Sequence, residues 1–187
     1  RISYMAIKQL LIAPEKKLKE LSKPVKFVDS GVSDLINDMF ETMYAAEGIG
    51  LAAIQIGIPK RVIIVDIHEE NEPSNPMCLI NPVIIEASDK KIVYNEGCLS
   101  LPEHFAEIER PGEVKISYID RNNENHEISA QGVLAVCLQH EIDHLDGILF
   151  VDYLSALKRK MILRKLAKAK RVEGEKFGQP VKKKNRL

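Results

Sequence analysis

The chain has 187 residues, the length of one domain or of one domain with an appendage. Hydrophobic residues make up 45% and charged residues 29%, which excludes wholesale disorder and a collagen-like repeat. Three cysteines are too few for a disulfide framework, so reduced thiols and a cytoplasmic location are expected. No apolar run reaches the roughly 20 residues that cross a bilayer, and no signal-like segment opens the sequence, so no membrane partner is expected.

The first half of the chain predicts one helix and two strands. A helix is expected from Ser33, with apolar residues at three- and four-residue steps, until Gly48 and Gly50 end it. Residues 61–67 are a β-branched run and predict a strand. Residues 79–85 predict another strand, which Pro82 would place at a sheet edge or a bulge.

The second half predicts a β-hairpin and two further helices. Residues 113–119 alternate apolar and polar side chains, and residues 120–123 have the composition of a turn before a second short strand. Residues 131–145 form a helix that is apolar over most of its circumference, so it belongs at the centre of the fold. Residues 155–171 repeat a helical pattern among lysines. The whole indicates an α+β fold: short antiparallel strands packed around a central helix, with a C-terminal helix.

The net charge of zero hides an uneven distribution of charge. Residues 1–157 carry 14 lysines and arginines against 25 aspartates and glutamates, whereas residues 158–187 carry 13 against 2. A basic terminal segment is typical of proteins that contact a polyanion, RNA above all, because each phosphate contact releases counterions. A solvated, solubilising charged helix is the plainer interpretation. The sequence therefore predicts a domain over 1–157 and a basic C-terminal helix and tail over 158–187.

The central predicted helix carries an H-E-x-x-H pattern from His140 to His144. Histidines four residues apart lie on one helical face, roughly 6 Å apart in rise, so both imidazoles can reach one ion with Glu141 beside it. Satisfied histidines on a surface helix are the alternative, but the flanking residues are apolar. Burying these groups would be costly without a divalent cation, so the motif predicts a metal site.

A catalytic metal site needs a third protein ligand and an open position for water. No histidine follows His144 in the sequence, so the third ligand is expected upstream, where Cys98 and Cys137 compete. Cys137 lies roughly 10 Å in helical rise from His144, which makes a shared ion implausible, and is better interpreted as an apolar pocket wall. Cys98 lies in a segment where Gly97 permits close backbone approach, so this segment can deliver both a thiolate and backbone N–H groups.

Three motifs occur in order along the chain: GIGLAAIQIG at residues 48–57, EGCLS at 96–100 and QHEIDH at 139–144. With these motifs the chain resembles the peptide deformylase family, over roughly residues 7–155. The resemblance implies that residues 1–157 are a catalytic domain. It also implies a hydrolase that removes the formyl group from the N-terminal formylmethionine of newly synthesised proteins and releases formate.

The resemblance implies a role for each motif residue. Cys98, His140 and His144 would bind one divalent ion, usually Fe²⁺ in the family, with Zn²⁺, Ni²⁺ or Co²⁺ able to occupy the site. Glu141 would be the general acid and base. The oxyanion donors would be the Gln55 side chain and the backbone N–H of Leu99.

Substrate contacts are expected around these groups. The helical residues that precede His140 share its face and would line the pocket for the methionine side chain, although plain core residues show the same spacing. Glycines would let the substrate backbone approach and pair as an added strand. The expected substrate-binding residues are Gly48, Ile49, Gly50, Gly97, Val133, Val136 and Cys137.

Two positions depart from the residues usual in the family. Ile54 stands where most members have proline, which makes the loop presenting Gln55 less rigid, and Phe105 stands where many have a peptide-holding arginine, which favours a more apolar grip. The basic residues 155–187 resemble, in charge and position, a C-terminal helix that some members use near the ribosomal tunnel exit. Nascent formylated polypeptides and the ribosome are thus the expected partners, and DNA is not.

Two other functions remain open from the sequence. A zincin-type endopeptidase would use the same metal chemistry, but the cysteine ligand and the lack of a downstream third ligand disfavour it. A non-catalytic, ribosome-associated binding protein would keep the fold and use the basic end as an anchor. The intact Glu141 and Gln55 disfavour that function, because an inactive module needs neither.

Overall fold

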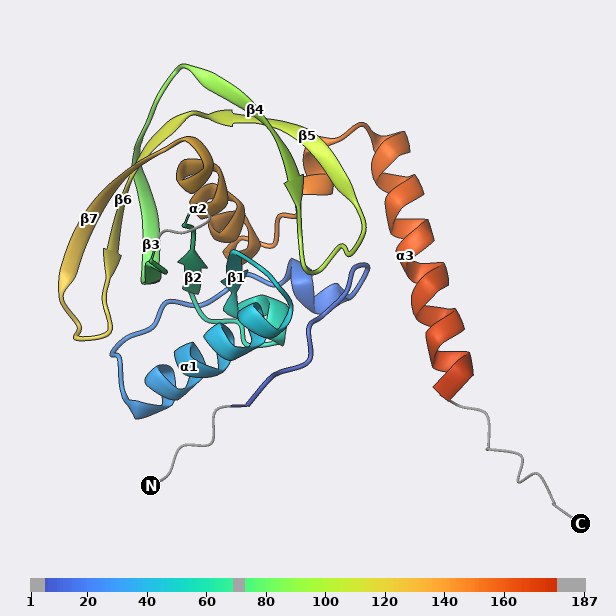
Figure 1. The fold of residues 1–187 in the computed structure, drawn as a ribbon, viewed down its shortest axis with the longest axis horizontal. Helices are drawn as coiled ribbons and strands as arrows, with labels where there is room; N and C mark the ends of the chain where they lie inside the picture. The colour runs from blue at the N-terminus through green and yellow to red at the C-terminus, as the bar shows by residue number, and fades with distance from the viewer. Residues whose placement is uncertain (1–5, 69–72, 178–187) are drawn as a thin grey trace, which may run out of the picture.

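The computed structural model describes residues 6–68 and 73–177, without the side chains of 173–177, and it has the α+β fold that the sequence predicts. The helices are α1 (Ser30–Ala45), α2 (Gly132–Leu145) and α3 (Ala156–Phe177), with 3-10 turns at Lys16–Lys19, Ala53–Ile56 and Phe150–Tyr153. The strands are β1 (Gly50–Ala52), β2 (Val62–Asp66), β3 (Pro76–Ala87), β4 (Lys91–Gly97), β5 (Phe105–Pro111), β6 (Glu113–Ile119) and β7 (Asn125–Gln131). Figure 1 shows α2 in the centre, with strands around it and α3 at the side.

The strands form two antiparallel sheets. One has five strands in the order β1-β2-β3-β6-β7, and the other pairs β4 with β5. The β6–β7 hairpin agrees with its prediction. Helix α2 packs beside β1 and β2 and also contacts β4 and β5. It is therefore covered by strands of both sheets, which explains why its sequence is apolar over most of its circumference.

Strand β2 separates helices α1 and α2. Successive side chains of a strand point to opposite faces, and here both faces are buried. Ile63 and Val65 pack in the cluster that contains α2, whereas Val62 and Ile64 pack in the cluster that contains α1. A continuous β-branched run is the composition that such a strand requires.

Helix α1 begins at Ser30, one turn before the predicted start at Ser33. The Asp29 carboxylate accepts a hydrogen bond from the Val32 N–H at 2.9 Å and caps the helix. Aspartate is as good an N-cap as serine, so both positions fit the sequence pattern. The cap at Asp29 adds Val32 to the buried face of the helix.

Of the two situations predicted for residues 79–85, a sheet edge or a bulge, the structure has the bulge. Strand β3 lies between β2 and β6, in the middle of the five-stranded sheet. The expected bulge is present: the pairing with β6 shifts between Ile80 and Val83, and Asn81 adopts a φ of 51°. This bulge accommodates Pro82, which has no N–H to donate to the neighbouring strand.

Strands β4 and β5 have no counterpart in the sequence predictions. Most of their side chains are at least partly exposed, and the buried ones include Glu96 and Arg110 as well as Ile108. A pattern of alternating apolar residues is therefore missing, because two of the inward positions hold charged residues.

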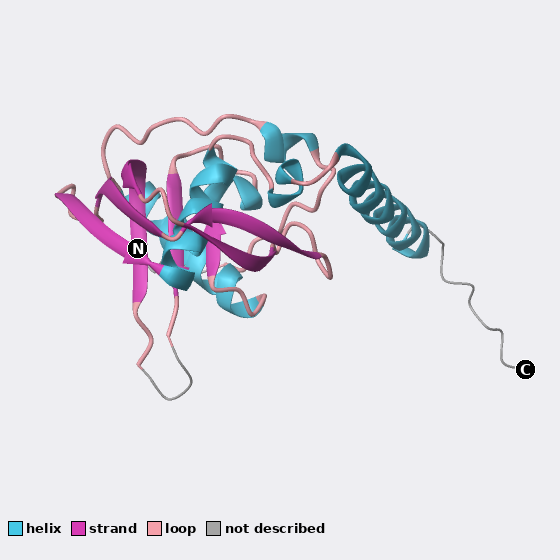
Figure 2. Cartoon of the chain, turned by 90° about the horizontal axis from the view of Figure 1, so that it is seen from above, coloured by secondary structure: helices cyan, strands magenta, loops and turns pink. Residues whose placement is uncertain are grey.

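Helix α3 extends away from the body of the molecule (Figure 2). Leu166 is buried against a cluster that contains Leu18, and Lys170 pairs with Glu15 at 2.9 Å, whereas Leu157 and Met161 are exposed. The helix runs beyond the predicted end at residue 171. Among the described residues, no helix is long and apolar enough to cross a membrane.

Candidate active site

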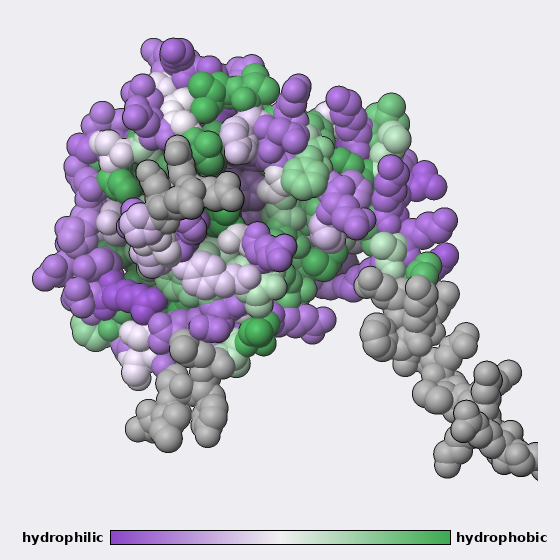
Figure 3. Space-filling model, viewed as in Figure 1, coloured by the Kyte–Doolittle hydropathy of each residue, from purple (hydrophilic) through white to green (hydrophobic). Residues whose placement is uncertain are grey.

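A pocket of about 430 Å³ opens between β1, the end of β4 and helix α2. The space-filling view shows this region as a hollow (Figure 3). It is lined by every site residue expected from the sequence except His144: Gly48, Ile49, Gly50, Gln55, Gly97, Cys98, Leu99, Val133, Val136, Cys137, His140 and Glu141. His144 is fully buried behind this wall.

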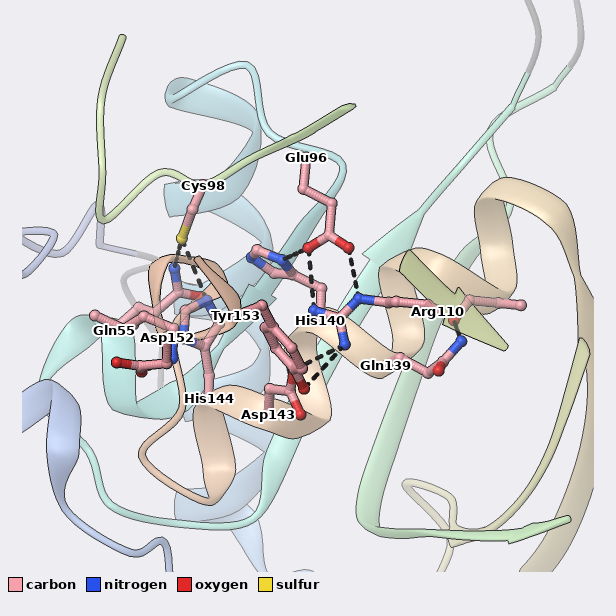
Figure 4. Close-up of polar contacts among 12 residues, drawn as sticks. Gln55, Glu96, Cys98, Arg110, Gln139, His140, Asp143, His144, Asp152 and Tyr153 are labelled. Atoms are coloured by element: carbon pink, nitrogen blue, oxygen red, sulfur yellow. Dashed lines mark hydrogen bonds and ion pairs between the residues drawn. The ribbon is translucent and has the colours of Figure 1, made fainter. Parts of the chain in front are cut away.

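Cys98, His140 and His144 meet at the back of the pocket. One ligand atom from each lies within 4.8 Å of the others. The Cys98 Sγ lies 3.3 Å from Nε2 of His144, and the two imidazole centroids are 4.9 Å apart (Figure 4). Helix α2 supplies both histidines from one face. Cys98, which directly follows β4, supplies the sulfur. Cys137, the competing cysteine, lies in the pocket wall outside this group.

A buried charge network holds His140 from the other side of its ring. His140 Nδ1 lies 2.8 Å from Glu96 Oε2, and Arg110 donates to both oxygens of Glu96. Arg110 also donates to Asp143 at 2.8 Å, and the Tyr153 hydroxyl donates to the same Asp143 oxygen at 2.8 Å. With Nδ1 occupied in this way, Nε2 is the nitrogen that His140 can offer to an ion.

The electrostatics of the two histidines differ. Burial lowers the pKa of His144, and the neighbouring His140 lowers it further, which leaves a neutral imidazole. Burial also opposes a charge on His140, but contacts with Cys98 and Glu96 outweigh it and raise the pKa. Cys98 and Glu96, whose negative charge favours a proton on His140, also favour a divalent cation at this place.

The donor set fits a divalent transition metal. One thiolate and two imidazoles suit Fe²⁺ or Zn²⁺ and leave a fourth position for water, as a catalytic site requires. The Nδ1 atom of His144 and the Oε2 atom of Glu141 are buried without a hydrogen-bond partner among the described residues. Two buried polar atoms without a hydrogen-bond partner are unusual in one site, and they indicate that these side chains have a role other than stabilising the fold.

Glu141 lies beside this group and is 4% exposed. Burial raises the pKa of its carboxyl to about 7, although His140 opposes the shift. A carboxyl group with such a pKa can both accept and donate a proton near neutral pH. A Cβ on Gly50 would lie 2.5 Å from the Glu141 carboxylate, so Gly50 makes room for this side chain.

Gln55 is fixed so that its amide nitrogen faces Cys98. Its Oε1 accepts from the Ala52 N–H at 2.8 Å, and its Nε2 lies 3.1 Å from Ser100 Oγ and 3.5 Å from Cys98 Sγ. Gln55 is buried, and Ile54 before it is buried too. The Gln55 amide is therefore held in place by the backbone next to its own 3-10 turn. This turn forms with isoleucine at position 54, where the family usually has proline.

The protein's own side chains fill the space above the pocket glycines. A Cβ on Gly48 would lie 2.7 Å from Leu99, and one on Gly97 would lie 2.5 Å from Phe105. These glycines allow internal packing that shapes the pocket wall, a reason that sequence reasoning did not include. Of the residues expected to hold a methionine side chain, Ile49 and Val133 are exposed, whereas Val136 and Cys137 are buried in the wall.

Several residues of the site escaped sequence reasoning. Asp143 and Tyr153 complete the charge network, and Glu47, Tyr94 and Glu103 line the pocket. Asp143 lies within the H-E-x-x-H stretch and shares a helix with it, which could have drawn attention to it. The others lie in segments whose composition is ordinary for an exposed surface.

Comparisons with known proteins agree with this geometry. The family model for polypeptide deformylase matches residues 7–160. The peptide deformylase of Rhizobium meliloti is 49% identical over 172 residues, which are 92% of this chain and 99% of the relative.

Solved structures give the same result. The crystal structure of peptide deformylase from Ehrlichia chaffeensis has a TM-score of 0.86 and 41% identity, over 90% of this chain and 99% of that one. The Met-Ala-Ser-bound structure of class I type b peptide deformylase from Acinetobacter baumannii has a TM-score of 0.76 and 35% identity, over 80% and 99%. The chain therefore belongs to the peptide deformylase family, metal-dependent hydrolases that remove the formyl group from an N-terminal methionine.

Proposed function

We propose that this pocket deformylates nascent polypeptides with Glu141 as the general acid and base. The observation that carries the proposal is a buried carboxyl group, unpartnered at Oε2 among the described residues, beside a cysteine and two histidines. Most buried carboxylates in proteins are hydrogen-bonded, whereas the Oε2 atom of Glu141 has no partner among the described residues. Its chemistry suits proton transfer.

Cys98, His140 and His144 are the proposed ligands of one divalent ion. When bound, such an ion lowers the pKa of water and polarises a carbonyl oxygen. Glu96 and Arg110 keep the His140 ring oriented through its Nδ1. Gln55 cannot rotate freely, since Ala52 and Ser100 hold both ends of its amide.

The proposed reaction moves one proton through Glu141. Its carboxylate accepts a proton from the water that attacks the formyl carbon. The negative charge that develops on the formyl oxygen is stabilised by the Gln55 Nε2–H and the backbone N–H of Leu99, and each such donor typically contributes about 10²–10³ in rate. Glu141 then donates its proton to the α-amine, the carbon–nitrogen bond breaks, and formate leaves.

The apolar wall of the pocket supports methionine as the residue bound there. Ile49, Val133, Val136 and Cys137 line one connected surface next to Glu141. The relative from Acinetobacter baumannii binds Met-Ala-Ser. We infer that the methionine side chain of this chain's substrate packs on the same wall.

Formate release from formyl-Met-Ala-Ser tests this function. Purified protein is expected to release one formate for each free amine that appears, and to leave acetyl-Met-Ala-Ser and internal peptide bonds intact. The variant Cys98→Ala serves as the control, because it loses the proposed thiolate ligand and should lose both metal and turnover. Cleavage of internal bonds would favour the endopeptidase instead, and no formate release with metal bound would favour a non-catalytic protein.

Fe²⁺ is the proposed native ion, on the ground of the family resemblance and of a donor set compatible with it. Metal analysis of protein purified without oxygen should then find iron, with Zn²⁺, Ni²⁺ or Co²⁺ as functional replacements. Activity of the iron form should fall on aeration and be protected by a reductant. Full activity after prolonged exposure to air would contradict an iron enzyme.

The basic C-terminal segment is the proposed ribosome contact of a cytoplasmic enzyme, with residues 1–157 as the catalytic part. Truncation after Leu157 would remove Leu166, which is buried, so charge reversal is the cleaner test. The exposed side chains of Lys160, Arg164 and Lys168 can be changed to glutamate together. Sedimentation with ribosomes should be salt-sensitive in the wild type and lost in this variant, while formate release remains. Unchanged sedimentation would contradict the proposed contact.

A further inference from the structure

The turn between β6 and β7, drawn in yellow in Figure 1, carries a second group of metal-binding side chains. We propose that Asp120, Glu124 and His126 form a site for a divalent transition ion such as Zn²⁺. One ligand atom from each lies within 4.8 Å of the others. Among the side chains that the structure describes, only these three and the Cys98 group meet this condition. None of the three lines the pocket around Glu141, so this site is separate from the one described above.

The separations between the ligand atoms match the coordination shell of a tetrahedral zinc ion. His126 Nε2 lies 3.1 Å from Asp120 Oδ2 and 4.0 Å from Glu124 Oε2. Zinc bonds of about 2.0–2.2 Å place tetrahedral ligands roughly 3.3–3.6 Å apart. The longer distance therefore has to shorten, and the Glu124 side chain, which is 69% exposed, has room to make this adjustment. Three ligands leave a fourth position for water.

Two of the three ligands are already oriented towards each other. Asp120 Oδ1 accepts hydrogen bonds from the backbone N–H groups of Asn122 at 2.8 Å and Glu124 at 2.9 Å, while its Oδ2 faces His126. The His126 ring packs against Tyr118, its partner in the β6–β7 pairing, with ring centroids 5.7 Å apart. Side chains that are held before binding lose less conformational freedom when a metal binds.

The turn itself is fastened to the body of the molecule by the residues between the ligands. Arg121 donates to Asn37 Oδ1 at 2.9 Å, and its guanidinium carbon lies 5.7 Å from the centre of the Phe40 ring. Asn123 Oδ1 accepts from the Val28 N–H at 2.8 Å. The ligands therefore stand on a backbone that is fixed at two points.

The charge and the chemistry of the group favour a divalent transition ion. Neither Asp120 nor Glu124 makes an ion pair with a lysine or arginine of the described ranges. The only ion-pair partner of either is His126, which is charged only when it is protonated. Carboxylates alone suit Mg²⁺ or Ca²⁺, whereas an imidazole ligand suits zinc, copper, iron and nickel.

Zinc titration of the full chain tests this site. The protein is first loaded with zinc at the Cys98 group and is then titrated with Zn²⁺ in equilibrium dialysis, at a slightly alkaline pH where imidazoles are neutral. We expect the binding of a second zinc ion. It should raise the unfolding temperature, because the three ligands come together only in the folded hairpin. The NMR signals of the His126 ring should shift as the second ion binds.

Two variants assign the second ion to the named residues. His126→Ala and Glu124→Gln should each weaken the second binding event by more than about 10-fold, since even the outer-shell partners of a metal contribute about 10- to 100-fold. Asp120 stays in place because it also binds the backbone of the turn. His104→Ala is the matched control, because His104 lies in the loop between β4 and β5 and belongs to neither ligand group. This control should keep the wild-type affinity.

The outcomes decide the inference independently of deformylation. A wild-type protein that binds no second zinc ion at any point of the titration would overturn it, and the three residues would form an exposed ion pair only. A second ion that both variants retain would also overturn it, since zinc would then bind elsewhere. Equal weakening in His104→Ala would have the same meaning. None of these results depends on formate release, which has its own test.

Discussion

Two buried carboxylates of this molecule, Asp66 and Glu141, have opposite surroundings. They are 3% and 4% exposed. Asp66, at the end of β2, accepts hydrogen bonds from the hydroxyls of Tyr44 and Ser74 and from the Asn75 N–H. Glu141 has an oxygen without any partner in the described structure.

The difference appears in the acidity of the two groups. Burial raises the pKa of both. At Asp66 the hydrogen bonds outweigh burial and hold the pKa at about 2, whereas at Glu141 burial prevails and the pKa is about 7. Burial alone therefore does not tell a structural carboxylate from a reactive one. The number of donors around it does, because each donor stabilises only the ionised form.

The largest expected effect comes from removing the acidity of Glu141. In Glu141→Gln, kcat should fall roughly 10²- to 10⁴-fold, the usual contribution of a general acid and base. Metal content and the unfolding midpoint should stay near those of the wild type, because glutamine has the same shape and Glu141 has no hydrogen bond at Oε2 to lose. Formate release, metal analysis and thermal melting together check this.

A Glu141→Gln enzyme with near-normal kcat would contradict the assigned proton transfer. A variant that loses metal as well as activity would show instead that Glu141 supports the ligand group. Asp66→Asn is the matched control, since it removes a carboxylate of similar exposure that does not line the pocket, and its kcat should stay within a factor of a few.

The second effect concerns Glu96, a buried carboxylate held by ion pairs. Arg110→Met removes its guanidinium partner and leaves the charge buried beside His140. Breaking one side of a buried ion pair typically costs about 3–5 kcal/mol of folding free energy. Urea unfolding should show this loss. Loss of less than 1 kcal/mol would mean that His140 alone compensates the charge of Glu96.

The three proposed metal ligands show how far the sequence could predict the site. The i and i+4 spacing is enough to predict that His140 and His144 lie side by side, because a helix fixes the distance between its own residues. Cys98 was expected from the lack of a downstream ligand and from the family resemblance. It follows the last residue of β4 directly, and the pairing of β4 with β5 is not visible in the local pattern.

Longer-range features were not predictable for a physical reason. The part of the network that runs from Arg110 to Asp143 and Tyr153 joins β5, α2 and the 3-10 turn at Phe150–Tyr153, and no local pattern in the sequence indicates that these residues meet. The central position of β3 likewise depends on a bulge at Asn81 that makes Pro82 compatible with two neighbours. Local sequence patterns predict whether a segment is a helix or a strand and which of its faces is buried. Contacts between segments that are distant in the sequence depend on the whole fold.

The third effect is the acid sensitivity of Asp66. Its pKa in the folded protein, about 2, lies below the ordinary value of 3.8, so the folded state binds fewer protons than the unfolded state. The stabilisation is complete above about pH 4 and is lost as the pH falls towards 2. The stability difference between wild type and Asp66→Asn should therefore shrink by roughly 2 kcal/mol over this range.

Urea unfolding at several pH values measures this difference. The exposed Asp89 provides the control, since Asp89→Asn removes one carboxylate from the surface and leaves the hydrogen bonds of Asp66 in place. A constant gap between wild type and Asp66→Asn from pH 4 to pH 2 would contradict the low pKa.

The smallest effect is expected for Tyr153, the outermost residue of the network around Arg110, whose hydroxyl should contribute to stability and not to catalysis. In Tyr153→Phe the hydroxyl that donates to Asp143 is lost, while the ring stays 4.9 Å from the Arg110 guanidinium carbon. Asp143 keeps its bond from Arg110 at 2.8 Å, so only about 0.5–1.5 kcal/mol of stability should be lost. Because Tyr153 is half exposed and reaches His140 only through Asp143, Arg110 and Glu96, kcat should change less than 2-fold. A larger fall in kcat at unchanged stability would mean that the position of His140 depends on the Tyr153 hydroxyl. The hydrogen-bonded network around Arg110 would then act on catalysis as well as on stability.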